Sequence, residues 1–146
     1  MRAAEAGFTL IEMLVVVSIL GLSLMVVPAI TGGIGGSRLR AASDSMIAVL
    51  RETRAEALRR DGPADFVLSM SGESYATSWR ASKQQLPGAV TKVEIVPPAL
   101  ADAKGLVLIR FQPDGRATPA QIMLFSGDRR VVIGVDWLTG RVRQDD

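Results

Sequence analysis

The feature that most constrains this chain is a long apolar segment close to its N-terminus. No residue from Met13 to Ser37 carries a charge, and residues 13–30 are almost entirely apolar. A helix of roughly twenty such residues is long enough to cross the hydrocarbon core of a bilayer. One acid, Glu12, borders the segment, and an acid in that place costs on the order of 3 kcal/mol unless it is paired. The sequence therefore predicts a membrane-spanning helix and a specific role for Glu12.

Two ordinary interpretations of the same segment stay open on the residues alone. It fits a secretory signal peptide, with Arg2 as its basic end, an apolar core, and a small-residue cleavage site at residues 27–29. It fits a plain signal anchor equally well. Glu12 argues against both, because an acid at the front of an apolar core weakens insertion and contributes nothing to cleavage.

Composition limits the remaining functions. With 146 residues and a net charge of +2, the chain has room for one membrane segment and one small domain. It contains no cysteine and no histidine, so it has no disulfide and lacks the commonest general base and metal ligand. Aromatic residues make up only 5%, which gives little basis for a surface that stacks on nucleic-acid bases.

No arrangement of side chains points to catalysis. Asp114 and Asp128 are the available carboxylate pair, but both stand in turn signals, where Asp commonly bonds the local backbone. Ser126 precedes a glycine but has no histidine partner for triad chemistry. We therefore expect no enzymatic activity, no cofactor and no metal site.

A glycine-rich stretch at residues 32–36 follows the apolar segment. Each of its glycines lowers helix stability by about 1 kcal/mol relative to alanine. Together with Pro28 they predict a kink, loosening or interruption of the helix, and residues 32–36 are interpreted as a hinge.

Helical periodicity resumes over residues 37–60. Apolar or small residues recur there at steps of three and four: Leu39, Ala42, Met46, Val49 or Leu50, Thr53 and Ala57. The charged residues lie largely off this stripe and are interpreted as a solvated face. The residues Asp61-Gly62-Pro63 predict the end of the helix. We expect the stripe to pack on a sheet.

From Ala64 onward the pattern is that of short strands and turns. Alternation over residues 66–70 and 75–79 predicts a hairpin, in which Trp79 shares one face with Tyr75 and Thr77. Further strands are predicted at 93–96, 106–111, 121–125 and 131–135. The last three are apolar on nearly every residue, so we expect them to be buried on both faces, by the helix and by a second sheet.

The N-terminal residues carry a family resemblance. Gly7-Phe8-Thr9-Leu10-Ile11-Glu12 followed by an apolar helix resembles the processing site of type IV pilins and of the pseudopilins of type II secretion. The resemblance implies that residues 1–7 are a prepilin leader, which a prepilin peptidase cuts between Gly7 and Phe8. It implies that Phe8 is then methylated on its amine, and that Glu12 pairs with the N-terminal amine of a neighbouring subunit.

The same resemblance assigns the rest of the membrane segment. Residues 8–31 would form the transmembrane and filament-core helix, in contact with membrane lipid. In the family the helix near a proline at the depth of Pro28 can unwind when subunits pack into a filament. The chain would cross the inner membrane once, with residues 37–146 in the periplasm.

Segments of the second half narrow the resemblance to the GspH/FimT branch, which includes the H-type minor pseudopilin. They are residues 54–57 (Arg-Ala-Glu-Ala), residues 111–115 (Phe-Gln-Pro-Asp-Gly) and the closing residues 136–143, with Thr-Gly-Arg at 139–141. The branch implies an α+β fold, with a long N-terminal helix packed on a small domain of two antiparallel sheets. It also implies a structural subunit near the tip of a periplasmic pseudopilus, which helps to export folded proteins across the outer membrane. Its partners would be the other major and minor pseudopilins and the inner-membrane assembly platform.

A second function stays open beside secretion. Gly140-Arg141-Val142-Arg143 resembles the basic C-terminal element with which FimT-like minor pilins bind DNA for natural transformation. Arg141 and Arg143 would point the same way on a strand. Residues 128–146, however, hold four Arg and four Asp, and a neutral region binds phosphate weakly. The sequence therefore favours secretion and argues against nucleic acid as a partner.

Overall fold

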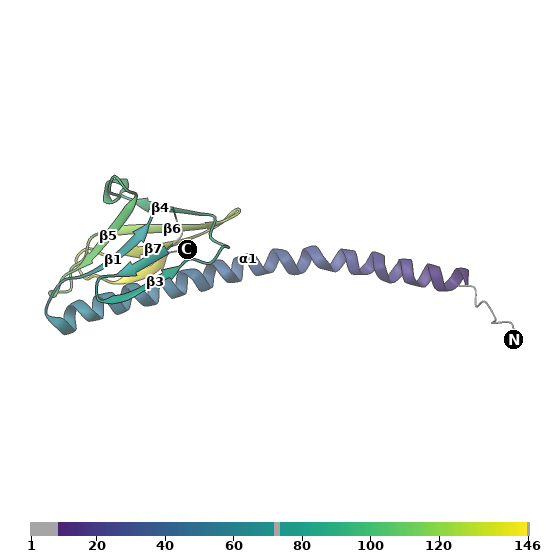
Figure 1. The fold of residues 1–146 in the computed structure, drawn as a ribbon, viewed down its shortest axis with the longest axis horizontal. Coiled ribbons are helices and arrows are strands. Elements are labelled where there is room, and N and C mark those ends of the chain that lie inside the picture. The colour runs from purple at the N-terminus through teal and green to yellow at the C-terminus, as the bar shows by residue number, and fades with distance from the viewer. Residues whose placement is uncertain (1–8, 72–73, 146) are drawn as a thin grey trace. The chain divides into compact units, whose positions relative to one another are not determined.

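The computed structural model describes residues 9–71 and 74–145, and within its long helix it leaves the side chains of residues 23–35 undescribed. The elements are helix α1 (Leu10–Arg60), strands β1 (Ala64–Ser69), β2 (Ser74–Thr77), β3 (Arg80–Gln85) and β4 (Lys92–Val96), the 3₁₀ turn η1 (Pro98–Leu100), and strands β5 (Leu106–Phe111), β6 (Ala120–Ser126), β7 (Arg129–Val135) and β8 (Val142–Asp145) (Figure 1). The chain divides into two compact units, Met1–Ile34 and Gly35–Asp146, and all the strands belong to the second.

The domain is built from two four-stranded antiparallel sheets, with strand orders β3-β2-β1-β5 and β4-β6-β7-β8. The β1–β2 hairpin is confirmed, with Phe66 opposite Thr77. In the second sheet β6 lies between β4 and β7 and pairs with both over its length. The predicted α+β class with two antiparallel sheets is confirmed.

The part of α1 that belongs to the domain packs its predicted stripe into the core. Every residue of that stripe is buried when Leu50 is taken as its central member: Leu39, Ala42, Met46, Leu50, Thr53 and Ala57. Four of them, Leu39, Met46, Leu50 and Ala57, share one hydrophobic cluster with residues of both sheets, including Phe66, Phe111, Ile122 and Ile133. The apolar periodicity of the helix is thus explained by burial against the sheets.

Backbone geometry at the end of α1 explains why the helix stops at Arg60. Asp61 adopts a left-handed conformation with φ 51°, and the N–H of Gly62 donates to the carbonyl of Ala57 at 3.3 Å. A left-handed residue followed by this long-range bond is the Schellman arrangement, which satisfies a free carbonyl of the last turn. The predicted helix end at residues 61–63 is confirmed.

The glycine-rich stretch does not interrupt α1. Helical backbone runs through residues 32–36, so the predicted resumption of the helix at Ser37 is replaced by one element of 51 residues. The boundary between the two units nevertheless falls inside this stretch, between Ile34 and Gly35. A hinge or kink at Pro28 and residues 32–36 stays a prediction.

Several strand predictions need correction. Trp79 lies in the turn between β2 and β3, because β2 ends at Thr77, and strands β3 and β8 were not predicted. The expectation of burial on both faces is wrong for β5, since Leu106 and Leu108 are 40% and 42% exposed while Val107 and Ile109 are fully buried. It is also wrong for β6, in which Gln121 is exposed and the alternate residues are buried. Antiparallel sheets commonly have one face on the core and one outside, and β5 follows that rule despite its apolar outer residues.

Candidate functional site

The beginning of α1 is held by its own side chains. The hydroxyl of Thr9 accepts a hydrogen bond from the backbone N–H of Glu12 at 3.3 Å, and the Thr9 carbonyl accepts from the N–H groups of Glu12 and Met13. A threonine before the first turn with a glutamate three residues later is the capping-box pattern. Thr9 therefore caps the helix, a role that the pattern Thr-x-x-Glu signalled but that the sequence analysis did not assign.

Glu12 lies in the first turn of α1 with its carboxylate exposed. A negative charge there is favoured by the helix dipole. Among the described residues no cation forms an ion pair with this carboxylate. Gly7 and Phe8, the predicted cleavage and methylation residues, lie outside the described residues, and the side chain of Pro28 is not described.

The first part of α1 exposes many large apolar side chains. Ten of them, from Leu10 to Leu22, are each at least 44% exposed. So large an apolar surface is characteristic of a segment that contacts lipid or other subunits. Within the described residues, no helical stretch meets the length and hydropathy required of a membrane-crossing helix.

The domain segments on which the family resemblance rests meet at one place. Arg54 of α1 donates from Nε to the carbonyl of Thr139 at 3.0 Å. Gly140, at φ 59°, lies so close to the 112–115 turn that a Cβ added to it would stand 2.5 Å from the carbonyl oxygen of Gly115. Three segments far apart in the sequence therefore form a single contact, and glycine is required at its centre.

The loop that carries Thr139 and Gly140 is closed by Asp136. One carboxylate oxygen of Asp136 accepts hydrogen bonds from the N–H of Leu138 and from both the N–H and the hydroxyl of Thr139, at 2.7 to 3.1 Å. The pKa of Asp136 lies below its usual value of 3.8, and the largest cause is the hydrogen bond from the Thr139 hydroxyl. The backbone hydrogen bonds and the charge of Arg143 lower it further. Asp136 therefore serves to stabilise the loop.

Arg141 and Arg143, the predicted DNA contacts, lie together with two arginines of the helix. Arg51, Arg54, Arg141 and Arg143 line a cavity of about 440 Å³ with Val142. The Arg51 guanidinium also donates to the carbonyl of Val142 at 3.2 Å, which fixes it against β8. We call this site, formed by the four arginines and Val142, the arginine groove. The sequence placed Arg51 and Arg54 on a solvated face, and only the position of β8 beside the helix shows that they line the groove.

Glu56 of the helix is engaged locally. Glu56 is only 7% exposed and accepts hydrogen bonds from the Arg59 guanidinium at 2.7 Å, with Arg60 as a second partner. The pKa of Glu56 lies below its usual 4.5, chiefly because of the hydrogen bond from Arg59 and also because of the charges of both arginines.

Asp114, the catalytic candidate set aside above, accepts a hydrogen bond from the Arg116 guanidinium at 2.6 Å. Among the described residues no group of three or more metal-ligating side chains gathers.

Comparison with known proteins identifies related sequences over most of the chain. Residues 2–28 match the prokaryotic N-terminal methylation motif, and residues 42–139 match type II transport protein GspH. Type II secretion system protein H of Xanthomonas campestris pv. campestris is 32% identical over 146 residues, covering 97% of this chain and 84% of the relative.

Solved structures with a similar fold belong to two pilus-like systems. The minor pseudopilin EpsH from the type 2 secretion system of Vibrio cholerae matches with a TM-score of 0.59 and 11% identity, over 74% of this chain and 96% of that one. The type IV minor pilin FimU of Pseudomonas aeruginosa matches with a TM-score of 0.58 and 13% identity, over 75% and 90% of the two chains. At these identities the likeness establishes the fold.

Proposed function

This chain belongs to the family of type II transport protein GspH and is a minor pseudopilin of type II secretion, and we propose how its parts serve that role. The family is structural, and membership implies interaction with other pseudopilins of a type II secretion system. The observation that carries the assignment is the coincidence, in one chain, of the methylation motif at residues 2–28 with the GspH match at residues 42–139.

Maturation begins at the N-terminus in this proposal. A prepilin peptidase removes residues 1–7, and Phe8 becomes the methylated N-terminal residue. Thr9 then directly follows the new terminus, and its cap on the N–H of Glu12 supports a helix that starts at once. The Met13–Ile30 segment anchors the chain in the inner membrane with a single crossing, and the domain lies in the periplasm.

Glu12 guides assembly into the pseudopilus. Its carboxylate has no cation within the described residues, and the apolar side chains that follow it need a cover of lipid or neighbouring helices. An unpaired charge in such surroundings is costly, and a second charge of opposite sign removes much of that penalty. We assign that charge to the N-terminal amine of an adjacent subunit. The attraction between the amine and Glu12, with the help of the assembly platform, moves this chain from the membrane into the tip of the filament.

The test combines processing with export. In a strain lacking its own H-type pseudopilin, the wild-type chain recovered from membranes should have the mass of residues 8–146 plus one methyl group, and it should restore secretion. Glu12→Gln, which removes the charge and keeps the shape, should be cut and membrane-bound but should lower secretion strongly.

Asp44→Asn is the matched control, because Asp44 is an exposed acid of the same helix with no ion pair among the described residues. It should secrete as the wild type does. A chain that starts near Ile30 would refute the prepilin maturation, and full secretion by Glu12→Gln would refute the pairing role.

The DNA-uptake alternative has one feature in its favour, the arginine groove. Arg141 and Arg143 share it with two helix arginines, so the local positive charge exceeds that of the C-terminal residues alone. The match to a type II secretion protein favours secretion. A mobility-shift assay at physiological salt decides, because retention of duplex DNA that is lost in Arg141→Gln/Arg143→Gln would support uptake.

A further inference from the structure

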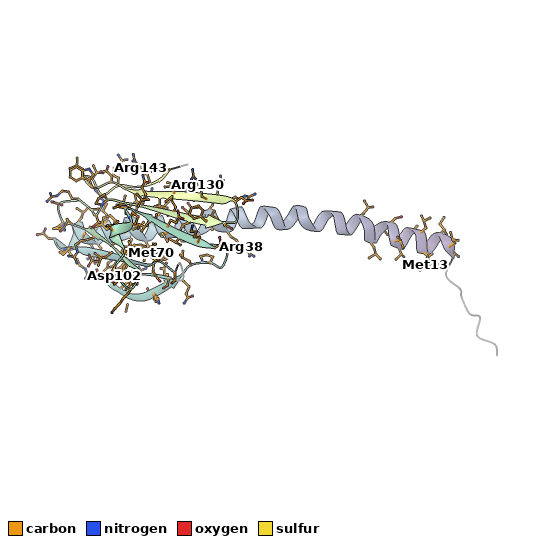
Figure 2. The ribbon with its side chains drawn as sticks, turned by 90° about the horizontal axis from the view of Figure 1, so that it is seen from above. Met13, Arg38, Met70, Asp102, Arg130 and Arg143 are labelled. Atoms are coloured by element: carbon orange, nitrogen blue, oxygen red, sulfur yellow. The ribbon has the colours of Figure 1, made fainter. Side chains whose placement is uncertain are left out.

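A second basic cavity lies at the end of the domain where α1 enters it. Its volume is about 560 Å³, and it is lined by Gly36, Ser37, Leu39 and Arg40 of α1, Arg129, Arg130 and Val131 of β7, and Gln144 of β8. Figure 2 places the labelled Arg38 and Arg130 at this end of the domain. We call this site the entry pocket.

The entry pocket offers hydrogen-bond donors and positive charge without a built-in counter-charge. No Asp or Glu lines it, and no ion pair of Arg40, Arg129 or Arg130 occurs within the described ranges 9–71 and 74–145. The side-chain oxygen of Gln144 accepts from the Ser43 hydroxyl at 3.3 Å, which leaves the amide N–H groups of Gln144 as further donors. Such a lining suits an anion with several oxygens.

Gly36 gives the pocket its shape. A Cβ at this position would collide with the guanidinium of Arg129, so the guanidinium lies directly against the helix where a side chain is lacking. Arg129 is exposed and its guanidinium is the far end of a flexible side chain, so this contact brings the planar donor group to the pocket without fixing it there. This glycine therefore has a packing role apart from any hinge.

We infer that the entry pocket binds the phosphate of an anionic phospholipid headgroup on the periplasmic side of the inner membrane. The inference rests on the proposed membrane anchor, and the chain itself supplies the argument for this occupant. Gly36 follows Ile30 by six residues, which span at most about 20 Å even when fully extended. The pocket is therefore tethered close to the headgroup layer whenever residues 13–30 are in the bilayer.

The lining also matches the parts of a headgroup. Arg40, Arg129 and Arg130 provide planar donors for phosphate oxygens, and the partly buried side chain of Val131 is available to the glycerol. A pocket of this size lies in the usual range for small ligands, roughly 300 to 1,000 Å³. Binding would hold the domain against the bilayer while the subunit is stored there, and extraction into the filament would release it.

Hydrogen exchange of the full-length chain in nanodiscs tests the inference. Nanodiscs of phosphatidylcholine are compared with nanodiscs in which phosphatidylglycerol replaces a rising fraction of that lipid. Exchange of the backbone amides at residues 127–131 should slow as phosphatidylglycerol increases. Each basic side chain near an anionic surface contributes about fivefold in affinity, so Arg129→Gln/Arg130→Gln should weaken binding to phosphatidylglycerol roughly 25-fold, and the slowing should be lost at the fractions that half-saturate the wild type.

Lys83→Gln/Lys104→Gln is the matched control, because it removes two charges from exposed lysines outside the pocket and should keep the slowing. Gly36→Ala keeps every charge but displaces the Arg129 guanidinium, so it should weaken the effect. The inference is overturned if wild-type exchange is the same in both lipids, or if the slowing survives in the arginine variant or is lost in the lysine variant. It is also overturned if inorganic phosphate or a soluble acidic peptide reproduces the slowing in phosphatidylcholine nanodiscs. A chain that does not enter nanodiscs at all contradicts the proposed anchor instead.

Discussion

Replacing Gly140 by alanine should test whether the contact between the family-defining segments stabilises the domain. Gly140 has φ 59°, and its added Cβ would lie 2.5 Å from the Gly115 carbonyl oxygen and 3.1 Å from Nε of Arg54. The nearest of these atoms is backbone in a tight turn, so it has little freedom to move away. The substitution therefore meets two separate penalties, one conformational and one steric.

The magnitude follows from these two terms. A left-handed conformation costs alanine roughly 1–2 kcal/mol, and an overpacked contact costs typically about 1–3 kcal/mol. Alanine has less conformational freedom than glycine in the unfolded chain, and this offsets the loss of stability by about 0.4–1 kcal/mol. We expect Gly140→Ala to lower the free energy of unfolding by about 2 to 4 kcal/mol, a large part of the stability of a small domain.

Urea unfolding of the full-length chain in mild detergent measures this loss. The chain has two tryptophans, Trp79 and Trp137, and both belong to the unit Gly35–Asp146, so their fluorescence reports on the domain and not on the membrane segment. A lower midpoint with an unchanged slope is the expected result, since that combination indicates a change in stability alone.

Two other glycines separate the penalties. Gly127 has φ 58° but nothing within 4 Å of an added Cβ. Gly127→Ala should therefore lower the free energy of unfolding by the conformational term alone, about 1 kcal/mol. Gly88 has neither constraint, and Gly88→Ala should be neutral or slightly stabilising. If Gly140→Ala costs no more than Gly127→Ala, the close approach to Gly115 is not a constraint and the reasoning fails.

Three further changes have defined outcomes. Asp61→Gly should raise the urea midpoint by the equivalent of about 0.5–1 kcal/mol, because glycine accepts the positive φ and removes an acid from the helix C-terminus; a lower midpoint would contradict this. The pKa of Glu56 is lowered by Arg59 and Arg60, so its carboxylate stabilises the fold above pH 4.5, and that contribution is lost as the pH falls; Glu56→Gln should therefore show a flatter dependence of unfolding on pH below about 5. Trp137 is 56% exposed, so Trp137→Ala should leave thermal unfolding by circular dichroism unchanged but reduce co-purification of other pseudopilins, and an equal yield of partners would exclude this surface from the interface.

The sequence predicted those parts of the fold in which the spacing of apolar side chains reflects which residues are buried. The helix stripe repeats at three- and four-residue steps because Leu39, Met46 and Leu50 point into the core. β5 was placed correctly at residues 106–111, but its burial was misjudged. Leu106 and Leu108 are apolar without facing the core, so periodicity carried no signal of which face lies outside.

The strands that sequence missed are edge strands. β3 is exposed at five of its six residues, and β8 buries only Val142. Both are held chiefly by backbone hydrogen bonds to a neighbouring strand, and those bonds leave no pattern of apolar side chains. The arginine groove could not be predicted for the same reason, because it requires β8 to lie beside Arg51 and Arg54.

The N-terminal motif, in contrast, was readable because its elements are contiguous. Glu12 stands at a fixed distance from Gly7 and Phe8 along the chain, and no tertiary contact is needed to bring them together. The cap from Thr9 to Glu12 is equally local. Sites assembled from neighbours in sequence are visible in the sequence, whereas the entry pocket joins residues about ninety positions apart and is not.

The same reasoning explains why three short segments, near residues 54, 115 and 140, carry the resemblance of the domain. Each contributes one part of a closed contact: Arg54 bonds the Thr139 carbonyl, and Gly140 fits against Gly115 only without a side chain. If the contact acts as a unit, the losses from changing its members should not add. Arg54→Ala removes two of the three atoms nearest to a Cβ at position 140, so Gly140→Ala should cost about 0.5–1 kcal/mol less in that background than in the wild type. Equal losses in the two backgrounds would mean that Arg54 and Gly140 stabilise the domain independently.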